Sequence, residues 1–200
     1  MSHLTLLETL TARSGTKSHL AERIAAVLFV TVLTAIAAQV SIPLPFTPVP
    51  FTFQPMVVLV GALALGAQLG TASQILYLAL GIVGLPVFAA SPVLPQGAAR
   101  LMGPTGGYLM AYPVAAFVAG WLAERGFDRR YLTAFVAMVA GLIVVYAGGV
   151  SWLAVINPNG GISGALAAGF VPFIVPDLIK LLFAAGALPS LWWVTGNLRI

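Results

Sequence analysis

The sequence predicts an all-α membrane protein, a bundle of six transmembrane helices. Of its 200 residues, 60% are apolar and only 7% carry a charge, whereas a soluble domain carries about 25% charged residues to cover its surface. The mean hydropathy is +1.03. A bilayer-spanning helix needs about 20 apolar residues, so the chain has room for about six spans and no second domain. The lack of cysteine excludes disulfides and thiolate metal sites.

The predicted spans are apolar runs separated by turns rich in proline, glycine or charge. They cover residues 24–40, 55–69, 72–85, 107–123, 131–153 and 163–188. The second and third are short and are split by Gly70 and Thr71, so we expect a tight hairpin there. Residues 42–50 hold four prolines and predict a stiff loop, because proline lacks an N–H and restricts the residue before it. We expect one membrane domain over residues 1–200, with a cytoplasmic tail at 1–20 and the six helices within 21–195.

The basic residues are unevenly distributed over the predicted connections. Seven of the nine fall on the side that holds both termini: Arg13, Lys17, Arg23, Arg125, Arg129, Arg130 and Arg199. Because positive residues favour the cytoplasmic side, both termini are predicted to be cytoplasmic and the proline-rich loops, 42–54 and 86–104, to face outward. The isoelectric point is 9.9, but the basic residues form no run. The predicted surroundings are therefore a lipid membrane, with no nucleic acid.

Asp177 and Lys180 lie well inside the last apolar run, where a charge costs about 3 kcal/mol on insertion scales. Their spacing places both side chains on one helix face, which Phe173 extends. Pro176 is expected to break the helix, which would put Asp177 at the N-terminus of a half-helix. Two interpretations follow. Either the pair neutralises itself, or it forms a polar ligand site in which the carboxylate accepts from N–H groups and the ammonium contacts a carbonyl or carboxylate oxygen.

Two further polar residues belong to the predicted outer mouth of the bundle. Arg100 is the one basic residue on the outer side, and its guanidinium suits bidentate binding of a carboxylate. A solvated loop residue is the alternative interpretation. Gln54 lies where the first proline-rich loop enters the second span, so it either lends an amide to the same mouth or caps the helix.

The string Gly103-Pro104-Thr105-Gly106-Gly107-Tyr108-Leu109 resembles the BioY family of biotin transporters, the S components of energy-coupling factor (ECF) transporters. Residues 42–45, 84–88 and 176–180 extend the resemblance over residues 24–186. The resemblance implies a six-helix bundle of the ECF S-component type, which binds biotin from outside and works with a T component and two ATPase subunits. It also implies that Asp177 and Lys180 belong to the ligand site and that Arg100 and Tyr108 stand near it, with packing as the alternative role of Tyr108.

The chemistry of biotin matches the candidate residues. Its ureido ring offers two N–H donors and a carbonyl acceptor, which match one carboxylate and one ammonium on adjacent helical turns. Its thiophane ring and valeryl chain are apolar and suit Phe173, Phe88 and Tyr108. Its carboxylate suits Arg100, although the sequence does not decide which cation takes which oxygen.

Three classes of function compete at this stage. The first is a biotin-binding S component. The second is an autonomous carrier, proton-coupled through Asp177 or facilitative, for biotin or another small vitamin. The third, an intramembrane enzyme, is poorest, because His3 and His19 sit in the tail and no acid–base pair or metal cluster accompanies the aspartate. We expect no cofactor, and without a Walker motif this chain cannot hydrolyse ATP itself.

Overall fold

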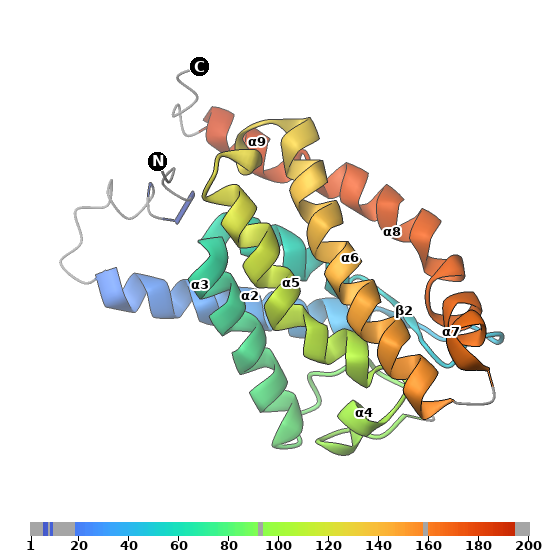
Figure 1. Cartoon of the computed structure of the whole chain (residues 1–200). Coiled ribbons are helices and arrows are strands. Elements are labelled where there is room, and N and C mark those ends of the chain that lie inside the picture. Colours follow the sequence, from blue (N-terminus) through green and yellow to red (C-terminus); the bar gives the residue numbers. More distant parts are fainter. Residues whose placement is uncertain (1–5, 8, 10–18, 92–93, 158–159, 195–200) are drawn as a thin grey trace.

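The computed structural model describes residues 6–7, 9, 19–91, 94–157 and 160–194, so most of the predicted tail lies outside the described residues. These residues form a helical bundle (Figure 1), which confirms the all-α prediction. The longer helices are α2 (His19–Gln39), α3 (Gln54–Ile82), α5 (Gly106–Ala123), α6 (Tyr131–Ile156) and α8 (Val171–Ala184). The shorter elements are α4 (Ala99–Met102), η1 (Phe127–Arg129), α7 (Gly161–Gly169), α9 (Ala187–Val194), β1 (Ser41–Ile42) and β2 (Phe51–Thr52). Five stretches of the described chain are helical, long and apolar enough to cross a membrane.

Helix α3 is a hairpin rather than a straight rod. Gly66 has φ 81° and ψ 179°, a backbone conformation that glycine adopts without steric penalty. The two arms run back beside each other, since the side chains of Gln54 and Tyr77 meet at 2.6 Å and Gly70 lies against the backbone of Ala62. The predicted hairpin is confirmed, but its bend lies at Gly66 and not at Gly70-Thr71. The number of bilayer crossings and the side on which the termini lie stay predictions.

The bend of α3 is held by the C-terminal end of α5. A Cβ at Gly120 would lie 2.4 Å from the carbonyl carbon of Gly66, so the two backbones touch. The Glu124 carboxylate accepts a hydrogen bond of 2.8 Å from the N–H of Ala67, the first residue after the bend. A carboxylate suits this position because the N-terminal end of a helix carries partial positive charge.

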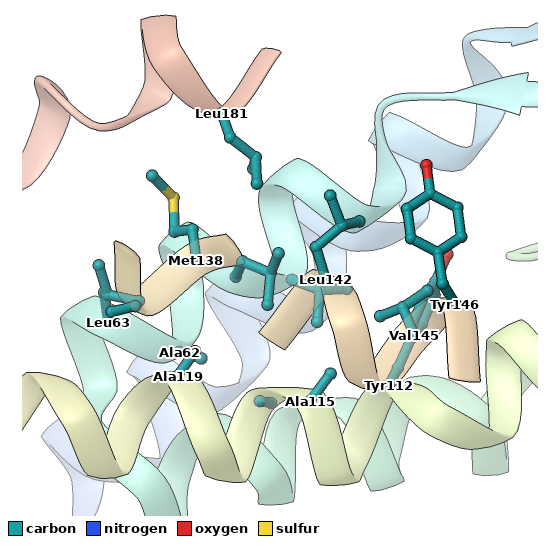
Figure 2. Packing of buried hydrophobic residues seen from close by; sticks show 14 of the residues in the cluster. Ala62, Leu63, Tyr112, Ala115, Ala119, Met138, Leu142, Val145, Tyr146 and Leu181 are labelled. Carbon is teal, nitrogen blue, oxygen red and sulfur yellow. The ribbon is translucent and has the colours of Figure 1, made fainter. Parts of the chain in front are cut away.

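Small side chains bring the central helices close together. Figure 2 shows Ala62 of α3 beside Ala119 of α5, with Met138 and Leu142 of α6 near them. All four are at most 3% exposed. Such close approach gains dispersion energy that lipid contacts cannot replace. Helix α2 is more peripheral, since 22% of its apolar stretch is buried inside the bundle, compared with 61% for α5.

The irregular backbone gathers at one end of the bundle. Figure 1 shows α4, β2 and α7 at that end, whereas α9 and the turn between α5 and α6 lie at the other. The Thr47 hydroxyl donates to the Ala168 carbonyl at 2.6 Å and the Trp152 indole donates to the Gly103 carbonyl at 3.0 Å, so the loops and helix ends are joined there. The predicted clustering of the two proline-rich loops at one mouth is thereby confirmed.

The predicted helix break at Pro176 is wrong. Helix α8 continues through Pro176, and the break between α7 and α8 falls at Phe170, with φ −126° and ψ −57°. Pro172 occupies the first turn of α8, where its missing N–H is not needed, and it disfavours helical backbone before it. Asp177 therefore lies in the second turn of α8 and not at its N-terminus.

Replacing Gly120 with alanine is expected to destabilise the bundle by about 1–3 kcal/mol, because the new methyl would overlap backbone atoms of the α3 bend. Unfolding by SDS in detergent micelles, followed by circular dichroism, measures the change. Gly164→Ala is the matched control, because a Cβ at Gly164 has no atom within 4 Å. Equal stability of both variants would contradict the contact between α5 and the bend.

Candidate ligand-binding site

A cavity opens at the loop end of the bundle. It holds about 590 Å³ of space between atoms, which includes open solvent at its mouth. Its walls come from both proline-rich loops and from helices α3, α5, α6 and α8. Five of the seven residues predicted for the site line it: Gln54, Arg100, Tyr108, Phe173 and Asp177. The loops and the last helix therefore converge as the sequence suggested.

Asp177 carries the negative charge of the cavity wall. Its Oδ1 contacts the Lys180 ammonium at 2.5 Å, and its Oδ2 accepts a hydrogen bond of 2.7 Å from the Tyr146 hydroxyl. An ionised carboxylate has about four acceptor positions, and these contacts use two. The two sequence-level interpretations thus hold together, because the carboxylate pairs with the lysine and still faces the cavity.

Lys180 is not among the residues that line the cavity, so its direct contact with a ligand stays a prediction. Its Nζ donates to the Thr52 carbonyl at 2.6 Å and lies 4.1 Å from the centre of the Phe51 ring. The aspartate and the carbonyl take two of its three N–H donors, and the ammonium also lies over the Phe51 ring. The ammonium therefore ties the end of the first loop to α8.

Arg100 is 1% exposed, so the alternative of a solvated loop residue is wrong. Its guanidinium donates to three backbone carbonyls, through Nη1 to Leu94 and Pro95, both at 3.2 Å, and through Nη2 to Ala89 at 2.6 Å. Burial lowers the pKa of Arg100 below its ordinary value, with an opposing contribution from Tyr77, but a guanidinium stays charged in proteins.

The charge of Arg100 has no acidic partner in the part of the chain that the structure describes. Its Nε is buried and makes no hydrogen bond there, and only one hydrogen of Nη2 is used. Nε and Nη2 lie on one edge of the planar guanidinium, the donor fork that in general binds a carboxylate through two parallel hydrogen bonds. A buried cation that lines a cavity, with its Nε and one hydrogen of Nη2 unused by the described residues, is suited to an anionic ligand group.

Gln54 and Tyr108 line the cavity and also hold the structure together. The Gln54 amide donates to the Tyr77 hydroxyl at 2.6 Å, which fixes its orientation. The Tyr108 hydroxyl donates to the Gly169 carbonyl at 2.8 Å, and its ring fills the space that a side chain at Gly149 would occupy. Tyr108 therefore both lines the cavity and packs against the neighbouring helices.

Phe88 does not line the cavity, so its contact with a ligand stays a prediction. It is fully buried and stands edge-on to Tyr77, with ring centres 5.6 Å apart. Its ring occupies the notch above Gly81, where a Cβ would lie 2.1 Å from it. Its apolar character reflects loop anchoring rather than ligand contact.

Four polar side chains of the wall were not predicted from the sequence: Tyr146, Tyr112, Thr105 and Thr52. A signal existed for the tyrosines, because a phenolic hydroxyl inside an apolar span needs a partner and marks a polar interior. The partner of Tyr146 lies 31 residues further along the chain, on another helix, so spacing does not reveal it.

The fold and the cavity together define a multi-pass membrane protein with a cavity at one end that is lined by an arginine and an aspartate. The model of the BioY family matches residues 8–197, and the chain belongs to the BioY family. The predicted resemblance is confirmed.

Similar proteins are named as transporters, in line with the expectation that the chain is not an enzyme. The probable biotin transporter BioY of Pyrococcus horikoshii is 41% identical over 160 residues, which cover 80% of this chain and 90% of that protein. The biotin transporter BioY of Thermotoga maritima is 44% identical over 155 residues, covering 78% and 86%. A solved S-component for biotin from an ECF-type ABC transporter superposes with a TM-score of 0.78 at 28% identity, covering 88% of this chain and 93% of that one. The fold is thus of the ECF S-component type.

Lys180→Met is expected to destabilise the protein by about 3–5 kcal/mol, because it leaves the buried Asp177 carboxylate without its cation. The double variant Asp177→Asn, Lys180→Met removes both charges and is expected to regain part of that loss. SDS unfolding of the two variants tests this. A double variant less stable than Lys180→Met alone would contradict the coupling.

Proposed function

We propose that the chain binds biotin in this cavity and acts as the substrate-binding S component of an ECF transporter. The observation that carries the proposal is the pair of opposite charges that line one cavity. Arg100 is buried with no acidic partner among the described residues, and Asp177, which lines the same cavity, has acceptor capacity left. Charges buried inside a membrane protein are costly, and they mark ligand or ion sites more often than packing.

Biotin supplies the groups that these side chains need. The N–H donors of its ureido ring match the acceptor positions left on Asp177, and its carboxylate matches the donor fork of Arg100. Phe173 and Tyr108 offer apolar surface to the thiophane ring and the valeryl chain. Because two of the three donors of Lys180 are already bound within the protein and Lys180 does not line the cavity, we assign the ligand carboxylate to the arginine.

Uptake requires partners in this proposal. The sequence lacks a Walker motif, so ATP must be hydrolysed by other subunits. The likeness to a solved S-component of an ECF-type ABC transporter supports a T component and two ATPase subunits as those partners. The cavity would then open to the outside of the cytoplasmic membrane, as the distribution of basic residues predicts.

Purified protein is expected to bind biotin with one-to-one stoichiometry in isothermal titration calorimetry. Asp177→Asn is expected to abolish detectable binding, since an amide donates where a carboxylate accepts. Arg100→Gln is expected to weaken binding about 100-fold, because it leaves the ligand carboxylate buried without a cation. Arg130→Gln, at an exposed arginine beside η1, is the matched control and should bind like the unaltered protein. Unchanged affinity of both site variants would refute this placement of biotin.

Energised uptake separates the S component from an autonomous proton-coupled carrier. We expect biotin accumulation in proteoliposomes only when the T component, both ATPase subunits and ATP are present, and we expect a protonophore to leave the rate unchanged. Accumulation by this chain alone that collapses on adding the protonophore would support the carrier instead.

A further inference from the structure

The loop that follows α3 is fastened by side chains from outside it. We call residues 86–89 the strap. The Tyr77 hydroxyl donates to the Val87 carbonyl at 3.0 Å, and Nη2 of Arg100 donates to the Ala89 carbonyl at 2.6 Å. The strap therefore connects Tyr77 of α3 to Arg100, because its Ala89 carbonyl accepts the shortest hydrogen bond of that arginine.

Helix α2 holds the same segment from the other side. Nε2 of Gln39 lies within 3.3 Å of the Pro86 carbonyl and 3.4 Å of the Phe88 carbonyl. Nε2 of Gln39 also lies 3.1 Å from the Ala35 carbonyl of its own helix, so its two hydrogens are shared among three carbonyls. Each of the four consecutive strap carbonyls thus lies within hydrogen-bonding distance of a side-chain donor from α2, α3 or α4. The strap has no regular secondary structure, so these side-chain donors fix a backbone that no ladder of hydrogen bonds supports.

Neither Gln39 nor Tyr77 lines the cavity. Tyr77 is fully buried, and its ring packs against the Phe88 ring within the strap. Any effect that these residues have on a ligand must therefore pass through the strap or, for Tyr77, through its second hydrogen bond, to Gln54.

We propose that Tyr77 and Gln39 are positioning residues for carboxylate binding, which act by fixing the strap and, through the Ala89 carbonyl, the guanidinium of Arg100. This inference rests on the proposed function for the identity of the ligand. A shift of the strap moves the strongest anchor of the guanidinium, because the other two bonds of Arg100 are longer, at 3.2 Å. The Nε and Nη2 groups of Arg100 are then no longer oriented toward the ligand carboxylate.

The test compares biotin with its uncharged amide, which keeps the ring system but lacks the carboxylate. Tyr77→Phe keeps the aromatic ring and removes the hydroxyl, whereas Gln39→Leu removes the amide and does not touch Gln54. Each variant is expected to weaken biotin binding about tenfold, the equivalent of one hydrogen bond, and to change amide binding by less than about twofold. Tyr131→Phe is the matched control, since it deletes a hydroxyl bond to the Leu182 carbonyl far from the strap.

A double-mutant cycle gives the second readout. In an Arg100→Gln background the Tyr77 and Gln39 substitutions should change biotin affinity by less than about twofold, because the group that they position is gone. Equal weakening of acid and amide, or additive effects in the cycle, would show a merely structural role and overturn the inference. If Arg100→Gln itself binds biotin normally, the proposed site fails instead.

Hydrogen–deuterium exchange of the ligand-free protein tests the strap without any ligand. Peptides covering residues 83–101 should exchange faster in Tyr77→Phe and Gln39→Leu than in Tyr131→Phe or the unaltered protein. Unchanged exchange would overturn the inference even if the chain binds biotin as proposed. Faster exchange in a protein that binds no biotin would instead refute the proposed function and leave the strap's hold on Arg100 standing.

Discussion

A guanidinium buried inside a folded bundle needs acceptors from the protein or from a ligand, because it is cut off from water. In this chain that constraint falls on Arg100, which is 1% exposed. Three backbone carbonyls take three of its five donors, and the described residues provide no carboxylate. Carbonyl dipoles position the cation without neutralising it. The loop around it, the cavity beside it and the proposed anionic ligand group all follow from this one unbalanced charge.

The two ends of the bundle meet different demands. At the end that holds the α3 bend, backbones touch at Gly66 and Gly120 and a carboxylate from α5 holds the bend. At the other end, loops and helix breaks leave backbone carbonyls that must be satisfied by side chains such as Thr47, Tyr108 and Lys180. Irregular backbone is tolerated at membrane depth only where it is buried in protein or lines a cavity. The end that carries the site is therefore held by side-chain hydrogen bonds to loop carbonyls, whereas the opposite end combines close backbone packing with the Glu124 hydrogen bond.

Much of the fold was predictable because composition and apolar run length are direct consequences of a lipid solvent. The hairpin of α3 was predictable from two short runs, but its bend was not, since Gly66 and Gly70 look alike in sequence and differ only in backbone angle. Asp177 and Arg100 could be predicted as cavity residues, because charged side chains are rare in and beside the apolar runs of this chain. The sequence did not show that Asp177 faces the cavity and Lys180 does not. Lys180 is held by the Thr52 carbonyl, which lies 128 residues earlier in the chain. The role of Tyr77 was likewise hidden, because it depends on where a neighbouring loop folds back.

The most direct test of the account is an experimental structure of the chain with biotin bound. The account predicts the ligand carboxylate about 3 Å from Nε and Nη2 of Arg100, and a ureido N–H at a similar distance from the Asp177 carboxylate. Biotin bound elsewhere, or bound in the cavity with its carboxylate away from an unmoved Arg100, would contradict it.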